Sequence, residues 1–128
     1  MNYPTPEARA FFNRELGFHA TGKEQDWELE FSDPHRVGEF IQNLETNEGH
    51  YRDDHKIALM ALILASLEEL AHLRQVPSST WAKVSAILKR SNIYSALIRD
   101  WVPDIAEQND FMISPTLRTM VLSGATGD

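Results

Sequence analysis

The chain has 128 residues, of which 42% are hydrophobic and 24% charged, and this composition predicts one folded domain and excludes a disordered chain. It contains no cysteine, which excludes disulfides, thiolate metal sites and cysteine nucleophiles and fits a reducing cytosol. Its net charge of -7 argues against a general nucleic-acid binder, because nucleic-acid phosphates would repel it.

The start of the chain has neither the basic nor the apolar region of a signal peptide. The longest strongly apolar run, residues 57–67, is far shorter than the ~20 residues needed to span a bilayer. We therefore expect a cytoplasmic protein that makes no membrane contact.

A first short helix is predicted over residues 5–16. Thr5 followed by Pro6 is typical of an N-cap with proline in the first helical position, and Gly17 is a natural stop. The inward side chains would be Ala8, Phe11 or Phe12, and Leu16.

Residues 22–33 show a different pattern. Trp27, Leu29 and Phe31 alternate with carboxylates, which is the periodicity of a strand, but no other segment offers a pairing partner. Because a lone strand cannot satisfy its own backbone, we predict an extended acidic loop whose aromatic side chains lie on the helices.

A second helix is predicted to start at Asp33 and Pro34 and to end near Asn47 and Gly49. Its apolar side chains recur at the helical spacing, at Val37, Phe40, Ile41 and Leu44.

The third helix should start at Asp53 or Asp54, whose carboxylate could cap the first amides. Between Ile57 and Leu67 the one polar residue is Ser66, so the helix is apolar on every side and should be surrounded by the others.

Further helix starts are predicted after Pro77 at residues 78–80, at Ser91 and Asn92, and at Ser114 and Pro115. Residues 124–128 should form a frayed tail. The predicted fold is all-α, a single domain over residues 1–128 in which five to six short helices surround a central apolar helix at about residues 54–73.

Two groups of histidines are candidate metal ligands. His50 and His55 flank two carboxylates, but the spacing matches no zinc signature, and capping already accounts for Asp53 and Asp54.

Glu69 and His72 have the Glu-x-x-His spacing of half a di-iron site, but the chain contains no second pair of this kind. An ion pair between Glu68 and His72, one helical turn apart, explains this segment better. We predict no metal site.

The local motifs of common enzymes are missing. The sequence has no glycine-rich phosphate loop, no Gly-x-Ser-x-Gly elbow and no His-Glu-x-x-His. We therefore expect no catalytic residues, no cofactor and no enzymatic activity, although a catalytic site assembled from distant residues would leave no local signature.

Charge is unevenly distributed along the chain. Residues 74–99 contain five of the 12 basic residues and no acidic one, at Arg74, Lys83, Lys89, Arg90 and Arg99. The other 7 basic residues stand against all 19 acidic ones, a balance of -12 outside this stretch.

Most of that excess lies in two acidic clusters, residues 23–33 and 100–110. Each is either a solvated face or a surface for a basic partner, because complementary charge speeds encounter and neighbouring aromatic side chains supply affinity. The candidate partner-binding residues are Glu24, Asp26, Glu28, Glu30, Asp100, Trp101, Asp104, Glu107 and Asp110.

Residues 32–102 contain five sequence segments in a characteristic order. They are Asp33-Pro34, Gly38-Glu-Phe-Ile-x-x-Leu44, Asp53-Asp54-x-Lys56, the run from Ile57 to Glu69, and Ile98-Arg-Asp-Trp101. This layout resembles small helical bacterial immunity proteins of polymorphic toxin and contact-dependent growth inhibition systems. The resemblance implies a cytosolic inhibitor that binds one cognate toxin domain, often a nuclease, as a monomer or in a heterodimer with the toxin, without contacting nucleic acid directly.

Two other classes of function stay open. One is a small helical metal-dependent enzyme that uses His50, His55, Glu69 and His72. The other is a regulatory protein whose basic stretch, residues 74–99, contacts nucleic acid.

Overall fold

The computed structural model describes residues 5–21, 24, 26–102 and 113–119. These residues form helices and no strand, in the order α1 (Pro6–Glu15), α2 (Trp27–Glu30), α3 (Val37–Asn47), α4 (Asp53–Leu73), α5 (Ser78–Arg90), the 3-10 helix η1 (Asn92–Tyr94) and α6 (Ser95–Trp101). Residues 114–119 are also helical. The all-α prediction is confirmed.

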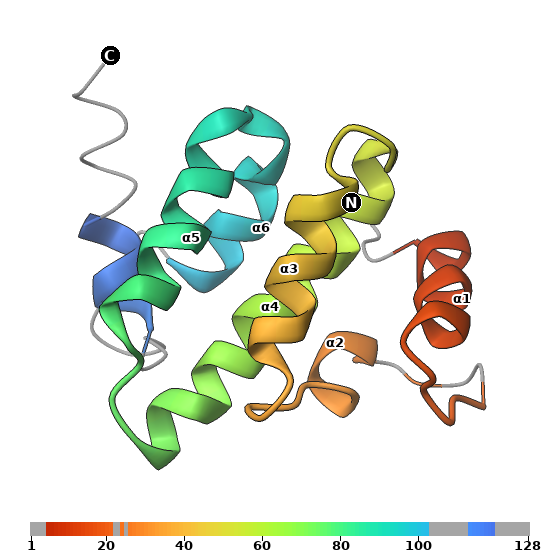
Figure 1. The fold of residues 1–128 in the computed structure, drawn as a ribbon, viewed down its shortest axis with the longest axis horizontal. Coiled ribbons are helices and arrows are strands. Elements are labelled where there is room, and N and C mark those ends of the chain that lie inside the picture. The colour runs from red at the N-terminus through yellow and green to blue at the C-terminus, as the bar shows by residue number, and fades with distance from the viewer. Residues whose placement is uncertain (1–4, 22–23, 25, 103–112, 120–128) are drawn as a thin grey trace.

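Helix α4 is the centre of the fold, as the sequence predicted. It packs against α1, α2, α3 and η1, and Figure 1 shows it running behind α3, between α1 on one side and α5 and α6 on the other. Every residue from Ile57 to Leu67 is buried, because the helix is apolar on all sides and only a complete ring of neighbours can remove it from water.

Helix α1 has the predicted ends. The Thr5 hydroxyl oxygen accepts a hydrogen bond from the Ala8 amide at 3.2 Å, and Pro6 stands at the first helical position. The chain leaves the helix through Gly17, whose φ of 73° is a left-handed conformation that glycine adopts without strain. Ala8 and Phe12 are buried against the core, while Phe11 is only partly covered.

The extended loop expected over residues 22–33 is wrong where the structure describes it, because Trp27–Glu30 form one turn of helix, α2. Trp27 and Phe31 are one helical turn apart, so both rings reach the core from the same side. Leu29 then points the other way and is 53% exposed. Five residues with this spacing fit a helix turn as well as a strand, and packing decides between the two.

Helix α3 begins at Val37, not at Asp33. The Asp33 carboxylate accepts a hydrogen bond from the His35 amide at 2.8 Å, which forms a separate turn ahead of the helix. The predicted inner face is confirmed, since its four apolar residues are buried.

The predicted capping role of Asp53 and Asp54 is also wrong. Both lie inside the first turn of α4, and Arg52 occupies the cap position without a side-chain cap. Asp54 instead accepts a hydrogen bond from the Thr5 hydroxyl at 3.1 Å, which connects α1 to α4.

The C-terminal helices start close to the predicted positions. Helix α5 follows Pro77, and the Ser91 hydroxyl accepts a hydrogen bond from the Ile93 amide at 3.3 Å to open η1. Residues 114–119 are helical behind the predicted start at Ser114, and the expected tail at 124–128 lies outside the described residues. None of the described helices is long and apolar enough to cross a membrane.

Candidate partner-binding surface

Four of the predicted partner-binding carboxylates lie around α2 and the end of α6. We call Asp26, Glu28, Glu30 and Asp100 the α2–α6 acidic surface. Asp26, Glu30 and Asp100 are exposed, and Glu28 is partly buried.

Helix α2 is held in place by the side chain of Trp27. Trp27 is 1% exposed, and its indole N–H donates a hydrogen bond to the Asn13 side-chain oxygen on α1 at 2.8 Å. The Phe18 ring lies edge-on to Trp27 at 5.9 Å and stacks on Phe31 at 4.7 Å. These aromatic contacts fix both ends of the short helix against α1 and the core.

The chain that leaves α2 is tied to α4. The Ser32 hydroxyl donates to the Leu29 carbonyl at 3.0 Å and also contacts the Glu69 carboxylate. One residue later, the Asp33 amide donates to the buried Ser66 hydroxyl at 3.0 Å. Ser66, the one polar residue of the apolar run, therefore serves to anchor the chain beside α2.

The Glu28 carboxyl is affected by charges from both acidic clusters. Burial raises the pKa of the Glu28 carboxyl, and the charges of Asp26 and Asp100 raise it further, although its own backbone N–H and Arg9 oppose them. Asp100 belongs to the second acidic cluster of the sequence. The fold therefore brings one residue of that cluster to the edge of the first.

Trp101 was predicted to be an exposed aromatic contact, and this is wrong. Its side chain is 6% exposed, because α6 turns it into the core. Its carbonyl accepts a hydrogen bond from the buried Ser114 hydroxyl at 2.6 Å. Trp101 thus positions the end of α6, where Asp100 stands, and its ring is not available to a partner.

The aromatic contact expected beside the carboxylates is replaced by Leu29. Leu29 and Leu73 are the large hydrophobic side chains that are exposed in the described part of the chain. Leu29 lies between Glu28 and Glu30 on α2, so an apolar side chain stands inside the acidic surface. The helical spacing of Trp27 and Phe31 was the sequence signal that could have identified it.

Of the remaining candidates, the structure describes Glu24. The Glu24 carboxylate accepts hydrogen bonds from the backbone amide and the hydroxyl of Thr21, at 2.8 and 2.9 Å, so it is committed to its own loop. Asp104, Glu107 and Asp110 lie outside the described residues.

The four residues of the metal-enzyme alternative do not form one site. His55 sits near the start of α4 and His72 near its end, about 25 Å apart along the helix at 1.5 Å per residue. His55 packs against the rings of Phe11 and Phe12, and the His72 ring contacts the Glu68 carboxylate at 3.0 Å, the two residues that the sequence spacing pairs. Among the residues that the structure describes, no group of three histidine or acidic side chains could hold a metal ion.

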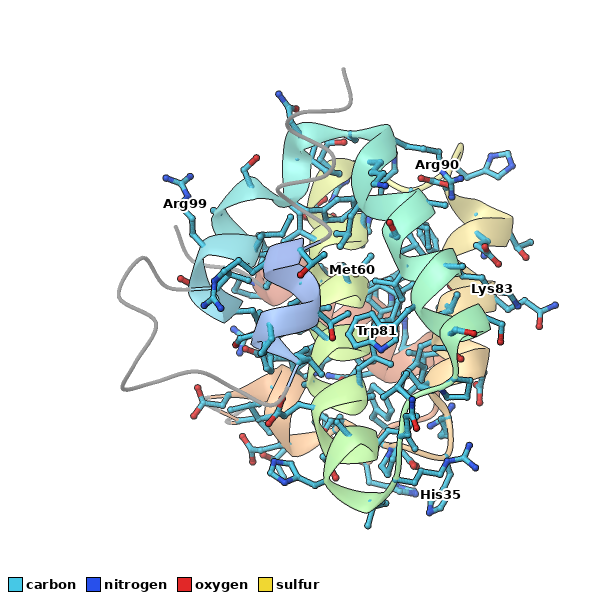
Figure 2. All side chains as sticks on the ribbon, turned by 90° about the vertical axis from the view of Figure 1, so that its left-hand side faces the viewer. His35, Met60, Trp81, Lys83, Arg90 and Arg99 are labelled. Carbon is cyan, nitrogen blue, oxygen red and sulfur yellow. The ribbon has the colours of Figure 1, made fainter. Side chains whose placement is uncertain are left out.

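The basic stretch does not form a single patch. Figure 2 shows Lys83 and Arg90 on the α5 side of the molecule and Arg99 on the opposite side of the same view. Arg90 is paired with Glu48 of the α3 end at 3.0 Å. Such a divided arrangement offers little continuous positive surface to a nucleic-acid backbone.

Comparison with protein-family models, with curated proteins and with solved structures found no match to this chain.

Proposed function

We propose that this protein is an immunity-type inhibitor that binds and neutralises a cognate toxin domain with a basic surface, such as a nuclease. The observation that carries the proposal is that the charges of Asp26 and Asp100, from two acidic segments, both act on the partly buried carboxylate of Glu28. The α2–α6 acidic surface is the site that we assign to the toxin.

The electrostatic argument rests on Glu28. A partly buried carboxylate beside two others is costly to ionise, as the raised pKa of Glu28 indicates. A cationic side chain of a partner would relieve that cost and would also be steered towards the surface during encounter. This favours a basic partner over a neutral or an acidic one.

The packing argument rests on Leu29. Charge gives rate and specificity, whereas an apolar side chain buried in the middle of an interface supplies much of the affinity. Leu29 is 53% exposed and flanked by carboxylates on α2, so it can enter a pocket of the partner while the charges pair around it.

The rigidity of α2 supports the same conclusion. Trp27, Phe18 and Phe31 hold the helix before any partner arrives. A surface that is already ordered loses less conformational entropy on binding, which suits a tight inhibitor.

The test is protection of growth. The toxin is expected to be the C-terminal domain of an exported protein encoded directly upstream, and this domain is expressed in bacterial cells with and without this chain. We expect growth to be restored by the chain and not by its Asp26→Lys/Asp100→Lys variant, which reverses one exposed charge from each acidic segment. An upstream gene that encodes no such protein, or toxicity that the chain leaves unchanged, contradicts the proposal.

The matched control is Glu15→Lys/Glu45→Lys. It makes the same change of net charge at two exposed acidic residues of α1 and α3. Because these residues lie outside the α2–α6 acidic surface, this variant should protect as well as the unchanged chain. Equal loss of protection in both variants would show that net charge, and not this surface, matters.

A further inference from the structure

A second surface, with an apolar lining, lies near the C-terminal end of α4. A groove of about 370 Å³ is formed where the end of α4, the start of α5 and residues 113–116 meet. Its apolar lining comes from Ala71, Val76, Trp81 and Ile113, and Arg74 stands among them. In Figure 2 the side chain of Trp81 extends from α5 towards the helical residues 114–119.

Trp81 differs from the other two tryptophans of the chain. Trp27 and Trp101 are buried in the core, whereas Trp81 is only partly covered and lines the groove. A large aromatic side chain that contacts the core and keeps part of its ring accessible is a frequent centre of binding energy in protein interfaces. The groove therefore offers a site for an apolar side chain of a partner.

Among the described residues that line the groove, Arg74 is the charged one, and the Glu68 carboxylate next to it is occupied by a hydrogen bond from the Ile113 amide at 3.1 Å. Arg74 and Lys83 are exposed, and the sequence between residues 74 and 99 contains no carboxylate. Arg74 borders the groove itself, so a carboxylate next to the inserted apolar side chain would be attracted.

We propose that this groove is a docking site for a protein segment that presents an apolar side chain next to an Asp or Glu. Charge complementarity selects this occupant, because a basic segment would be repelled by Arg74. A nucleic acid is disfavoured, because the groove has an apolar lining and the cations of residues 74–99 are divided between two sides of the molecule. The inference is independent of the proposed function, since the groove and the α2–α6 acidic surface share no residue.

The experiment is a selection of random peptides displayed on phage. The library is panned on the unchanged protein after subtraction on its Arg74→Glu variant, whose substitution is at an exposed residue and leaves the core intact. We expect enriched peptides that carry a large apolar residue beside a carboxylate. The proposal would be overturned if the enriched peptides lacked a carboxylate. It would also be overturned if no peptide were enriched after subtraction on the Arg74→Glu variant.

The selected peptide is then titrated while tryptophan fluorescence is recorded. The signal should change through Trp81, since the other two tryptophans are buried. We expect binding about tenfold weaker in Arg74→Glu and at least about tenfold weaker in Trp81→Ala. Lys89→Glu, an equal charge change at an exposed residue of α5 outside the groove, should bind normally.

Two other occupants would be recognised by the same measurements. Displacement of the peptide by a single-stranded DNA oligonucleotide would assign the groove to nucleic acid. Concentration-dependent sedimentation that Arg74→Glu abolishes would assign it to a second copy of the chain. Either result overturns the proposal, and neither bears on toxin inhibition through α2 and α6.

Discussion

The α2–α6 acidic surface and the basic stretch, residues 74–99, differ in how their charged side chains are arranged. Around α2, carboxylates from distant parts of the sequence approach one another, and Glu28 is ionised at a cost. In the basic stretch, residues 74–99, Arg90 is paired with Glu48, and Arg99 lies on the opposite side of the molecule from Lys83. Because like charges are gathered on the first surface and separated on the second, the comparison favours the acidic surface as the main binding site.

The largest expected effect comes from replacing Trp27, whose side chain holds α2 and therefore the acidic surface in place. Trp27→Ala should lower the free energy of unfolding by about 3–5 kcal/mol, because it leaves a cavity and removes the hydrogen bond to Asn13. Trp81→Ala should cost less than about 2 kcal/mol, because Trp81 is only partly buried. Urea unfolding of both variants measures the difference, and equal losses would contradict the role given to Trp27.

A smaller effect concerns the attachment of α1, which carries the hydrogen-bond partner of Trp27. Burial raises the pKa of Asp54, but the Thr5 hydrogen bond and the charges of His55 and Arg52 outweigh it, so the pKa falls below its ordinary value of 3.8. Asp54 therefore binds a proton more readily in the unfolded chain than in the folded one. Its ionised carboxylate stabilises the fold at pH values above its ordinary pKa. Asp54→Asn should cost about 1 kcal/mol at neutral pH.

The pH dependence of this loss is its check. The difference between Asp54→Asn and the unchanged chain should shrink as the pH falls through 3.8 and disappear once Asp54 is protonated in both the folded and the unfolded chain. A difference that stays constant down to acid pH would show that the charge of Asp54 is not involved.

The α5 side also contains a buried polar atom. Among the residues that the structure describes, the Tyr94 hydroxyl has no hydrogen-bond partner, and burial raises the pKa of Tyr94. Tyr94→Phe should therefore stabilise the chain by up to about 1 kcal/mol, because it removes an unsatisfied buried group. A loss of stability in thermal unfolding would reveal a partner for this hydroxyl.

The smallest expected effect concerns the charge of Glu28, and it tests whether ionisation on the acidic surface has a cost. Because the folded pKa of Glu28 is raised, its ionisation above the ordinary value of 4.5 costs stability, and this cost is absent at lower pH. Glu28→Gln should make the protein slightly more stable at neutral pH and no different once Glu28 is protonated, while weakening protection against the toxin. Reduced stability at neutral pH would remove the electrostatic argument.

The sequence predicted those elements whose signals are local. Helix α4 was evident from its apolar run, and the ends of α1 from Thr5, Pro6 and Gly17. Helix α2 was not, because Trp27, Leu29 and Phe31 are too few to separate the two periodicities until packing on Phe18 is known.

The candidate surface was predictable only in part. Its acidic residues could be named, but the effect of the Asp100 charge on Glu28 depends on tertiary packing, and no local pattern encodes it. The same packing buried Trp101, which was a candidate contact residue, and exposed Leu29, which was not. Both the burial of Trp101 and the exposure of Leu29 depend on the direction in which the side chain points, and composition and charge do not reveal that direction.

The central claim is that the α2–α6 acidic surface binds the toxin domain. The most direct test is the dissociation constant of the toxin complex for the unchanged chain, Asp26→Lys/Asp100→Lys and Glu15→Lys/Glu45→Lys, each first shown by circular dichroism to be folded. We predict that the first variant binds about 100-fold more weakly, with a reduced salt dependence, and that the second binds normally. Unchanged binding by Asp26→Lys/Asp100→Lys, or an equal loss in both variants, would contradict the account.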